Sequence, residues 1–203
     1  MSTETPAGHA IAERPIAPDI TIADPAPLGL AAFALTTFVL SLANAEIWPA
    51  TGSAVALAVA YGGSVQLLAG MWEFKRNNTF GATAFASYGG FWLSFFFLAI
   101  VVKETDPQAI GTYLLGWTIF TAYMTVGSLR VSGAVFLVFL LLTITFALLT
   151  IGAFQDTANS HTWTKAGGWV GVATAAAAWY ASFAGVVNST FRRVVLPTYP
   201  LTV

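Results

Sequence analysis

The feature that most constrains this chain is a series of six long apolar runs. They are Leu28–Trp48, Val55–Phe74, Thr83–Val102, Ile110–Leu129, Gly133–Phe154 and Gly167–Val187. A helix needs about 20 apolar residues to cross the hydrocarbon core of a bilayer. Because backbone groups in lipid must be satisfied within the protein, these runs are predicted to be helices; barrel strands are shorter and alternate in polarity. We therefore expect an all-α integral membrane protein, folded as a six-transmembrane-helix bundle.

Composition indicates that lipid covers most of the surface. Of 203 residues, 57% are hydrophobic and 8% are charged, whereas soluble domains carry about 25% charged residues. The net charge is -1 and no basic patch occurs, which argues against a nucleic-acid partner. The chain has no Cys, and its two His, His9 and His161, lack neighbouring ligands. Neither a metal site nor a cofactor is therefore expected.

The distribution of Lys and Arg predicts the orientation. Six spans put both termini on one side, together with the loops that follow the second and fourth spans. That side holds six of the eight cations: Arg14, Lys75, Arg76, Arg130, Arg192 and Arg193. The other side holds Lys103 and Lys165. The positive-inside rule then places both termini in the cytoplasm, with the protein in the cytoplasmic (inner) membrane of a cell.

The chain divides into three segments. Residues 1–23 contain three prolines and no long apolar run, which predicts a disordered cytoplasmic N-terminal tail without the pattern of a signal peptide. Residues 24–197 form the predicted six-helix transmembrane domain, and residues 198–203 a cytoplasmic C-terminal tail. The polar breaks between the spans are too short to hold a soluble domain of useful size.

The patterns that mark enzymes are missing from the spans. No glycine-rich phosphate loop with a Lys occurs, and no span holds paired carboxylates or a nucleophile–His–acid set. The centres of the predicted helices contain no ionisable residue, so an enzyme is not expected. Glu46 and Glu73 lie near helix ends, where each is expected to be a solvated interfacial acid; a proton-handling role is the alternative.

Three predicted helices carry polar or bulky residues at helical spacing. The stripes are Phe33, Thr37, Leu40 and Asn44 on the first, Gly62, Gln66, Gly70 and Glu73 on the second, and Phe85, Tyr88, Trp92 and Phe95 on the third. An amide in lipid must find a partner, so Gln66 and Asn44 are expected to face the bundle interior or a wet cavity. Hydrogen bonding between helices is an equally good account of both, and an aromatic stripe is more often packing than pore.

Small residues recur four positions apart in the spans. The pairs are Ala86 and Gly90, Gly167 and Gly171, and Ala181 and Gly185. Such pairs let helix backbones approach closely in lipid. We expect them to serve packing within one bundle rather than contacts between subunits.

Several short motifs, in order along the chain, resemble those of a known family. They are Asp24-Pro25-Ala26-Pro27-Leu28-Gly29-Leu30, Tyr61-Gly62-Gly63 with Gln66 and Gly70, Asn78-Thr79-Phe80-Gly81, Ser87-Tyr88-Gly89-Gly90-Phe91-Trp92, Phe146-Ala147-Leu148-Leu149 with Ile151-Gly152, and Val195-Leu196-Pro197. Together they resemble the acetate uptake transporters, a family that includes bacterial succinate–acetate permeases and fungal ammonia- and acetate-associated proteins. Asp24 departs from the usual Asn. Both cap helices well, but a negative charge at the entrance would repel an anion. Glu46 also departs, since a neutral residue is expected there.

The resemblance implies a homo-hexamer of six-helix subunits, each with its own pathway. It implies a narrow hydrophobic constriction at Phe33, Tyr88 and Leu142, from the first, third and fifth spans. Polar residues on either side would hold the carboxylate, and the candidates are Thr37, Asn44, Tyr61, Gln66, Ser87 and Thr143. The entrance motif corresponds to Asp24, Pro25, Pro27 and Gly29, and the candidate for a proton-linked residue is Glu46.

The function expected from the resemblance is the membrane transport of small carboxylates, acetate above all and succinate as a second candidate. An anion channel and a proton-coupled permease both fit. Hydroxyl and amide donors are enough for a weak site, and a weak site releases its substrate quickly. Two alternatives remain open: a channel for ammonium or another small solute, and a membrane sensor or scaffold that transports nothing.

Overall fold

A computed structural model describes residues 22–157 and 160–201. Within these residues, six helical spans are long and apolar enough to cross a membrane: Ala26–Asn44, Thr51–Lys75, Thr79–Val102, Pro107–Ser128, Gly133–Gln155 and Thr162–Phe191. The predicted number of spans and the all-helical class are confirmed. Almost all of the expected disordered tail, residues 1–23, lies outside the described residues, as do residues 202–203.

Each span consists of one to three helical segments. Single α-helices form α1 (Ala26–Asn44), α5 (Pro107–Ser128), α6 (Gly133–Gln155) and α7 (Thr162–Phe191). The second span joins α2 (Thr51–Val59), the π-helix η1 (Ala60–Val65) and α3 (Gln66–Lys75). The third span joins α4 (Thr79–Phe96) and the π-helix η2 (Phe97–Val102).

Polar side chains set the starts of three helices. Asn78 accepts a hydrogen bond from the Gly81 amide at the start of α4, Asp106 from Gln108 at the start of α5, and Ser132 from Val135 at the start of α6. The cap oxygen satisfies a backbone N–H that has no partner inside the helix. In three of the six spans, a capping side chain rather than hydropathy therefore determines where the helix begins.

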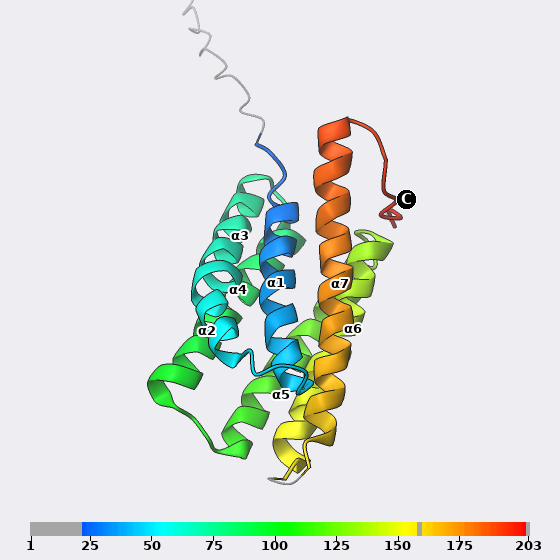
Figure 1. Cartoon of the computed structure of the whole chain (residues 1–203). Helices are drawn as coiled ribbons and strands as arrows, with labels where there is room; N and C mark the ends of the chain where they lie inside the picture. The colour runs from blue at the N-terminus through cyan, green and yellow to red at the C-terminus, as the bar shows by residue number, and fades with distance from the viewer. Residues whose placement is uncertain (1–21, 158–159, 202–203) are drawn as a thin grey trace, which may run out of the picture.

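The helices form a ring of neighbouring pairs around a central axis (Figure 1). α7 packs against both α1 and α6, and α6 also packs against α5. On the other side of α1 lie α2 and α3, and α3 packs closely against α4. The main buried hydrophobic cluster joins side chains of α1, α4 and α6, the first, third and fifth spans. This arrangement places three helices that are far apart in sequence around one axis.

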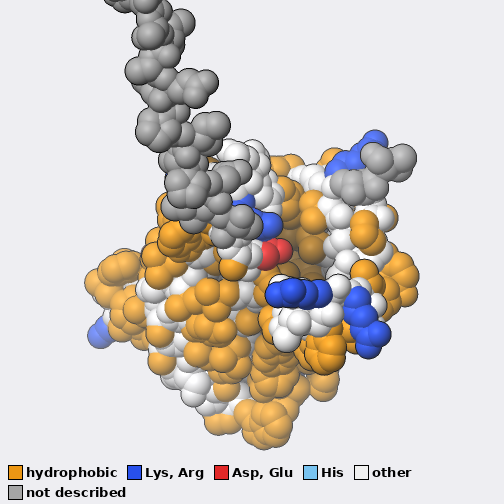
Figure 2. Space-filling view, turned by 90° about the horizontal axis from the view of Figure 1, so that it is seen from above, with side chains coloured by type: hydrophobic (Ala, Val, Ile, Leu, Met, Phe, Trp, Pro, Cys, Tyr) orange, Lys and Arg blue, Asp and Glu red, His pale blue; other side chains and the backbone are white. Residues whose placement is uncertain are grey.

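The outer surface of the bundle is apolar, as expected for contact with lipid. Ile119, Val126 and Phe183 are among many large hydrophobic side chains that stand exposed. A surface of this kind has no favourable contact with water. Figure 2 looks onto the end of the bundle where α1 begins, and Lys and Arg side chains gather there above the hydrophobic sides. The chain is a multi-pass membrane protein.

Close contacts between helices depend on small residues. A Cβ added at Gly168 of α7 would lie 2.3 Å from the Ala45 nitrogen, just beyond the end of α1. Added Cβ atoms at Gly167, Gly171 and Gly185 would also collide with α6, α1 or the Pro27 ring, whereas Gly90 has open space around it. The expected packing role within the bundle is therefore confirmed for the glycines of α7.

Replacing Gly168 by Ala is expected to destabilise the bundle by about 1–3 kcal/mol, because the new methyl group must push α1 and α7 apart. Gly90→Ala is the matched control. Its methyl group meets nothing within 4 Å, and Ala is favoured over Gly in a helix by about 1 kcal/mol. Thermal unfolding in detergent should show a lower midpoint for Gly168→Ala only. Equal midpoints would contradict the close contact.

Candidate transport pathway

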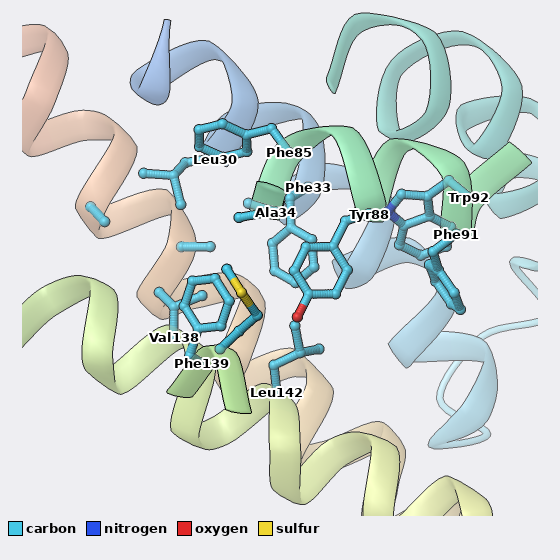
Figure 3. Close-up of a cluster of buried hydrophobic side chains, with 14 of the residues drawn as sticks. Leu30, Phe33, Ala34, Phe85, Tyr88, Phe91, Trp92, Val138, Phe139 and Leu142 are labelled. Atoms are coloured by element: carbon cyan, nitrogen blue, oxygen red, sulfur yellow. The ribbon is translucent and has the colours of Figure 1, made fainter. Parts of the chain in front are cut away.

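Phe33, Tyr88 and Leu142 converge in the centre of the bundle. They come from α1, α4 and α6, and they are 5%, 3% and 4% exposed, respectively. The ring centroids of Phe33 and Tyr88 lie 5.8 Å apart. Figure 3 shows the three side chains pointing toward one another. The structure thus brings together the three residues that the family resemblance assigned to a constriction.

Small cavities lie on both sides of this meeting point. The Thr37 cavity, of about 30 Å³, is lined by Phe33, Thr37, Leu40, Ser41, Asn44, Phe91, Trp92, Leu142, Thr145, Phe146 and Leu149. The Gln66 cavity, of about 20 Å³, is lined by Leu30, Phe33, Gln66, Ala84, Phe85, Tyr88, Val138, Phe139 and Leu142. Phe33 and Leu142 line both cavities, so these two side chains separate them. Each volume is enough for a water molecule.

A larger groove of about 280 Å³ continues from the Thr37 cavity. The two share Leu40, Asn44, Phe91, Phe146 and Leu149 as lining residues. The groove extends to Glu104 and Thr164, at the end of the bundle where α1 finishes. The groove, the Thr37 cavity and the Gln66 cavity therefore follow one another along the bundle axis. In this conformation, Phe33 and Leu142 block the connection between the two cavities.

Tyr88 is held in place by neighbours on α5 and α6. Its hydroxyl is hydrogen-bonded to the Thr121 hydroxyl at 2.9 Å. Its ring packs edge-on against Phe120, with centroids 5.4 Å apart, and lies 6.1 Å from the ring of Phe139. Because the hydroxyl is already bonded to α5, Tyr88 presents its ring rather than its polar tip to the passage.

Three of the predicted polar residues line the cavities. Thr37 and Asn44 line the Thr37 cavity, and Gln66 lines the cavity named after it. Gln66 is 1% exposed, and its side-chain oxygen has no hydrogen-bond partner among the described residues. Polar groups without a hydrogen-bond partner among the described residues therefore lie on both sides of Phe33 and Leu142.

The other three predicted polar residues line neither cavity. Tyr61 lies in the π-helix η1 and is half-buried. Ser87 lines a separate lateral groove of about 320 Å³, together with Tyr113, Gly116, Trp117 and Phe120. The Thr143 hydroxyl is committed to α5, since it is hydrogen-bonded to Thr125 at 2.8 Å. The structure does not bring these residues to the passage.

Glu73 differs from what its position near a helix end suggested. It was expected to be solvated, but it is fully buried at the end of α3. The Asn78 amide donates to Glu73 Oε2 at 2.9 Å, while Oε1 has no partner among the described residues. The prediction was wrong because Gly81, which has no Cβ, lets the start of α4 cover the carboxyl group; a Cβ there would lie 2.8 Å from Glu73 Cδ. Through Asn78, Glu73 holds the turn between α3 and α4.

Asp24 lies at the start of α1 and is paired. Arg76 donates to its Oδ1, and the Ala26 amide donates to the same oxygen at 3.0 Å. The carboxylate therefore caps the first turn of α1, as expected, while Arg76 offsets the negative charge that would repel an anion. Both side chains remain partly exposed, so the pair contributes little to stability.

Glu46 lies beyond the other end of α1, in an exposed cluster. Lys165 Nζ is 2.7 Å from Glu46 Oε2, and His161 Nδ1 is 2.8 Å from Oε1. The hydrogen bond from Lys165, followed by that from His161, holds the pKa of Glu46 below its ordinary value of 4.5. Glu46 does not line either cavity or the groove. It ties the end of α1 to the start of α7 instead.

Comparison with known proteins decides the family. Residues 8–203 match the GPR1/FUN34/yaaH family over almost the whole chain. The chain belongs to the GPR1/FUN34/yaaH family. Acetate permease A of Emericella nidulans is 45% identical over 194 residues, which cover 86% of this chain and 65% of that protein. This chain therefore spans about two thirds of the length of that fungal relative.

Bacterial members of the GPR1/FUN34/yaaH family match over nearly their full length. The succinate-acetate/proton symporter SatP of Escherichia coli K12 is 39% identical over 181 residues, which cover 87% of this chain and 95% of the symporter. A solved structure of the bacterial acetate channel SatP superposes with a TM-score of 0.83 at 39% identity, covering 88% of this chain and 99% of that one. The expected resemblance and the six-helix fold are confirmed.

The entrance motif of this family member has a structural role. The Pro27 carbonyl accepts a hydrogen bond from Ser182 of α7 at 2.6 Å, and the Pro25 carbonyl accepts one from the Gly29 amide at 3.0 Å. A Cβ at Gly29 would lie 2.6 Å from the Phe85 ring. Gly29 therefore lets the Phe85 ring, which lines the Gln66 cavity, pack directly on the backbone of α1.

Replacing Tyr88 by Phe is expected to cost only about 1 kcal/mol of stability. The ring stays, and the Thr121 hydroxyl keeps its 2.7 Å bond to the Trp117 carbonyl. Tyr88→Ala removes a packed aromatic ring and is expected to cost about 3–5 kcal/mol. Chemical or thermal unfolding of the two variants in detergent measures the difference. Equal losses would show that the hydroxyl, and not the ring, is the important part of Tyr88.

Proposed function

We propose that this chain transports small carboxylates, acetate above all and succinate as a second substrate, through a pathway inside each subunit. The observation that carries the proposal is the line of groove, Thr37 cavity and Gln66 cavity, in which Phe33 and Leu142 separate the two cavities. Relatives named for acetate and succinate transport support the choice of substrate. Phe33, Tyr88 and Leu142 act as the constriction.

The chemistry of the lining suits brief binding of a small acid. Among residues 22–157 and 160–201, no charged side chain lines the Thr37 cavity or the Gln66 cavity. Hydroxyl, amide and indole groups bind a carboxylate more weakly than an Arg would, which favours release. The ring of apolar side chains makes passage most costly for inorganic ions, which lose hydration there and have no apolar group to place against it. Phe33 and Leu142 stand between the two cavities, so they must move apart for the substrate to pass from one cavity to the other.

Uptake of labelled acetate into liposomes that contain the purified chain tests the proposal directly. Uptake should exceed that of empty liposomes, and unlabelled acetate should compete with it. Labelled methylammonium in a parallel assay tests the alternative of an ammonium channel. Uptake of methylammonium without acetate would replace the proposal, and no uptake of either solute would favour a sensor or scaffold.

Shrinking the constriction should widen the range of substrates. Phe33→Ala and Leu142→Ala each remove bulk from the wall that separates the two cavities. Larger acids such as succinate or lactate should then gain severalfold in uptake rate relative to acetate, measured with the same liposome preparations. The ratio between substrates is the readout, because loss of protein lowers every rate equally.

Phe146→Ala is a control from the same helix as Leu142. Phe146 lines the Thr37 cavity but not the Gln66 cavity, so its loss widens one chamber without opening the wall. If Phe33→Ala and Leu142→Ala fold and leave the substrate ratio unchanged, these side chains serve packing only and the constriction is misassigned.

Proton coupling, if present, is proposed to run without Glu46. A proton carrier must change its protonation state during the cycle. Lys165 and His161 lower the pKa of Glu46 from its ordinary value, and Glu46 lines neither cavity nor the groove. Glu46→Gln should therefore leave most of the pH dependence of acetate uptake intact. Loss of that dependence, with normal amounts of protein in the membrane, would make Glu46 a proton carrier.

Orientation and assembly complete the proposal. The end of the bundle where α1 begins carries Lys75, Arg76, Arg130, Arg192 and Arg193, and we place it with both termini in the cytoplasm. A reporter that is active only outside the cytoplasm, fused after Val203, should be silent.

We further propose a homo-hexamer, on the basis of the family resemblance. Native mass measurement in mild detergent should give six subunits, whereas a stable monomer would count against it.

A further inference from the structure

Thr37 is the exception among the buried threonines of the described chain. The other five are Thr36, Thr121, Thr145, Thr150 and Thr174, and each donates its hydroxyl hydrogen to the carbonyl four residues earlier. Thr37 is 5% exposed, yet its hydroxyl has no partner among the described residues. In lipid, a hydroxyl normally takes the helix carbonyl because no water is available. The Thr37 hydroxyl is therefore free for another acceptor.

A second buried donor lines the same cavity. Trp92 of α4 is 2% exposed, and its indole N–H has no partner in the described part of the chain. An indole nitrogen donates one hydrogen bond and accepts none. The group that satisfies Trp92 must therefore be an acceptor such as a carboxylate oxygen. Figure 3 shows the indole nitrogen on the side of the ring that faces Tyr88.

The geometry points to a carboxylate site, and we propose that the Trp92 indole and the Thr37 hydroxyl together bind the substrate carboxylate in the Thr37 cavity. The inference rests on the proposed transport function and adds Trp92 to it as a specificity-determining residue. Two donors from two helices match the two oxygens of one carboxylate. The rest of the cavity wall near the passage is apolar, with Phe33, Phe91 and Leu142 placed to contact a short alkyl group.

The site lies on the groove side of Phe33 and Leu142 and is the last polar position before them. Ser41 and Asn44 follow Thr37 along α1 toward the groove. A second carboxylate, as in succinate, would reach back toward these residues. No Lys or Arg of the described part of the chain lines the cavity, so the donors that we assign to the anion are neutral. Such binding is weak enough for the substrate to leave through the passage.

Two variants remove the donors, and transport kinetics in liposomes measures the result. Thr37→Val keeps the shape of the side chain, whereas Trp92→Phe keeps an aromatic ring but loses part of the indole. Thr37→Val and Trp92→Phe should each raise the KM for acetate about tenfold, the effect of losing one hydrogen bond to a charged group. Thr37→Ser, which keeps a hydroxyl, should restore the KM. Thr36→Val is the matched control, because the Thr36 hydroxyl already donates to the Ala32 carbonyl at 2.9 Å.

A binding measurement on the unmodified chain separates this inference from the transport function. With the indole nitrogens labelled, NMR resolves the seven Trp side chains, and the signal missing in Trp92→Phe identifies Trp92. Acetate, compared with chloride at equal ionic strength, should move the Trp92 N–H signal downfield. That shift supports the site even if liposomes show no uptake. Acetate uptake with no shift at Trp92, and an unchanged KM in Thr37→Val, would overturn the site and leave the transport function standing.

Discussion

The hydrocarbon interior offers no hydrogen bonds, and this constraint shapes every polar group in the bundle. Most buried threonines bond to their own helix, Tyr88 bonds to Thr121, and Tyr113 bonds to Ser94 at 2.8 Å. The buried side-chain atoms left without a partner in the described residues belong to Thr37, Gln66, Glu73 and Trp92. Three of these four residues line the two cavities on either side of Phe33 and Leu142. Unpaired groups thus concentrate where a polar solute is proposed to pass.

The same constraint explains why hydropathy predicts the fold so well but the helix ends less well. A run of 20 apolar residues has one outcome in lipid, so six runs give six spans. The ends depend on polar residues that hydropathy ignores. The third span begins at Thr79 rather than Thr83 because Asn78 caps it, and the second begins at Thr51 rather than Val55. The last helix continues to Phe191, beyond the apolar run that ends at Val187.

Helical spacing predicts which side chains share a face where the helix stays regular. On α1, a regular helix, Phe33, Thr37 and Asn44 all line the Thr37 cavity, as their spacing predicted. In the second span the predicted stripe of Gly62, Gln66, Gly70 and Glu73 is buried along its whole length. Tyr61, which the family resemblance proposed, lies one residue before that stripe and is only half-buried. For Thr143, the deciding factor is a partner on another helix, Thr125, which no pattern within its own span reveals.

The two residues whose surroundings the sequence did not predict share one property. Glu73 and Trp92 are polar or partly polar, and each lies near the end of a stripe whose members are mostly packed. Their importance comes from what is missing around them, namely a partner for a Glu73 oxygen and for the Trp92 N–H. A missing partner is a property of the folded neighbourhood and leaves no trace in spacing or composition. The sequence shows that Asn78 and Gly81 belong to a turn motif. It does not show that they cover the carboxyl group of Glu73.

The charges at the two ends of the bundle do not select one carboxylate over another. Arg76 offsets Asp24 at one end, and Lys165 offsets Glu46 at the other. The first end also carries Lys75, Arg130, Arg192 and Arg193, whose positive charge attracts anions whatever their alkyl group. Selection among acids then falls to the neutral donors and the apolar wall. Moving a second carboxylate past Phe33 and Leu142 exposes another charge to an apolar surface, at a cost that hydroxyl and indole donors on one side do not offset. A pathway built this way favours acids with one carboxylate and a short alkyl group.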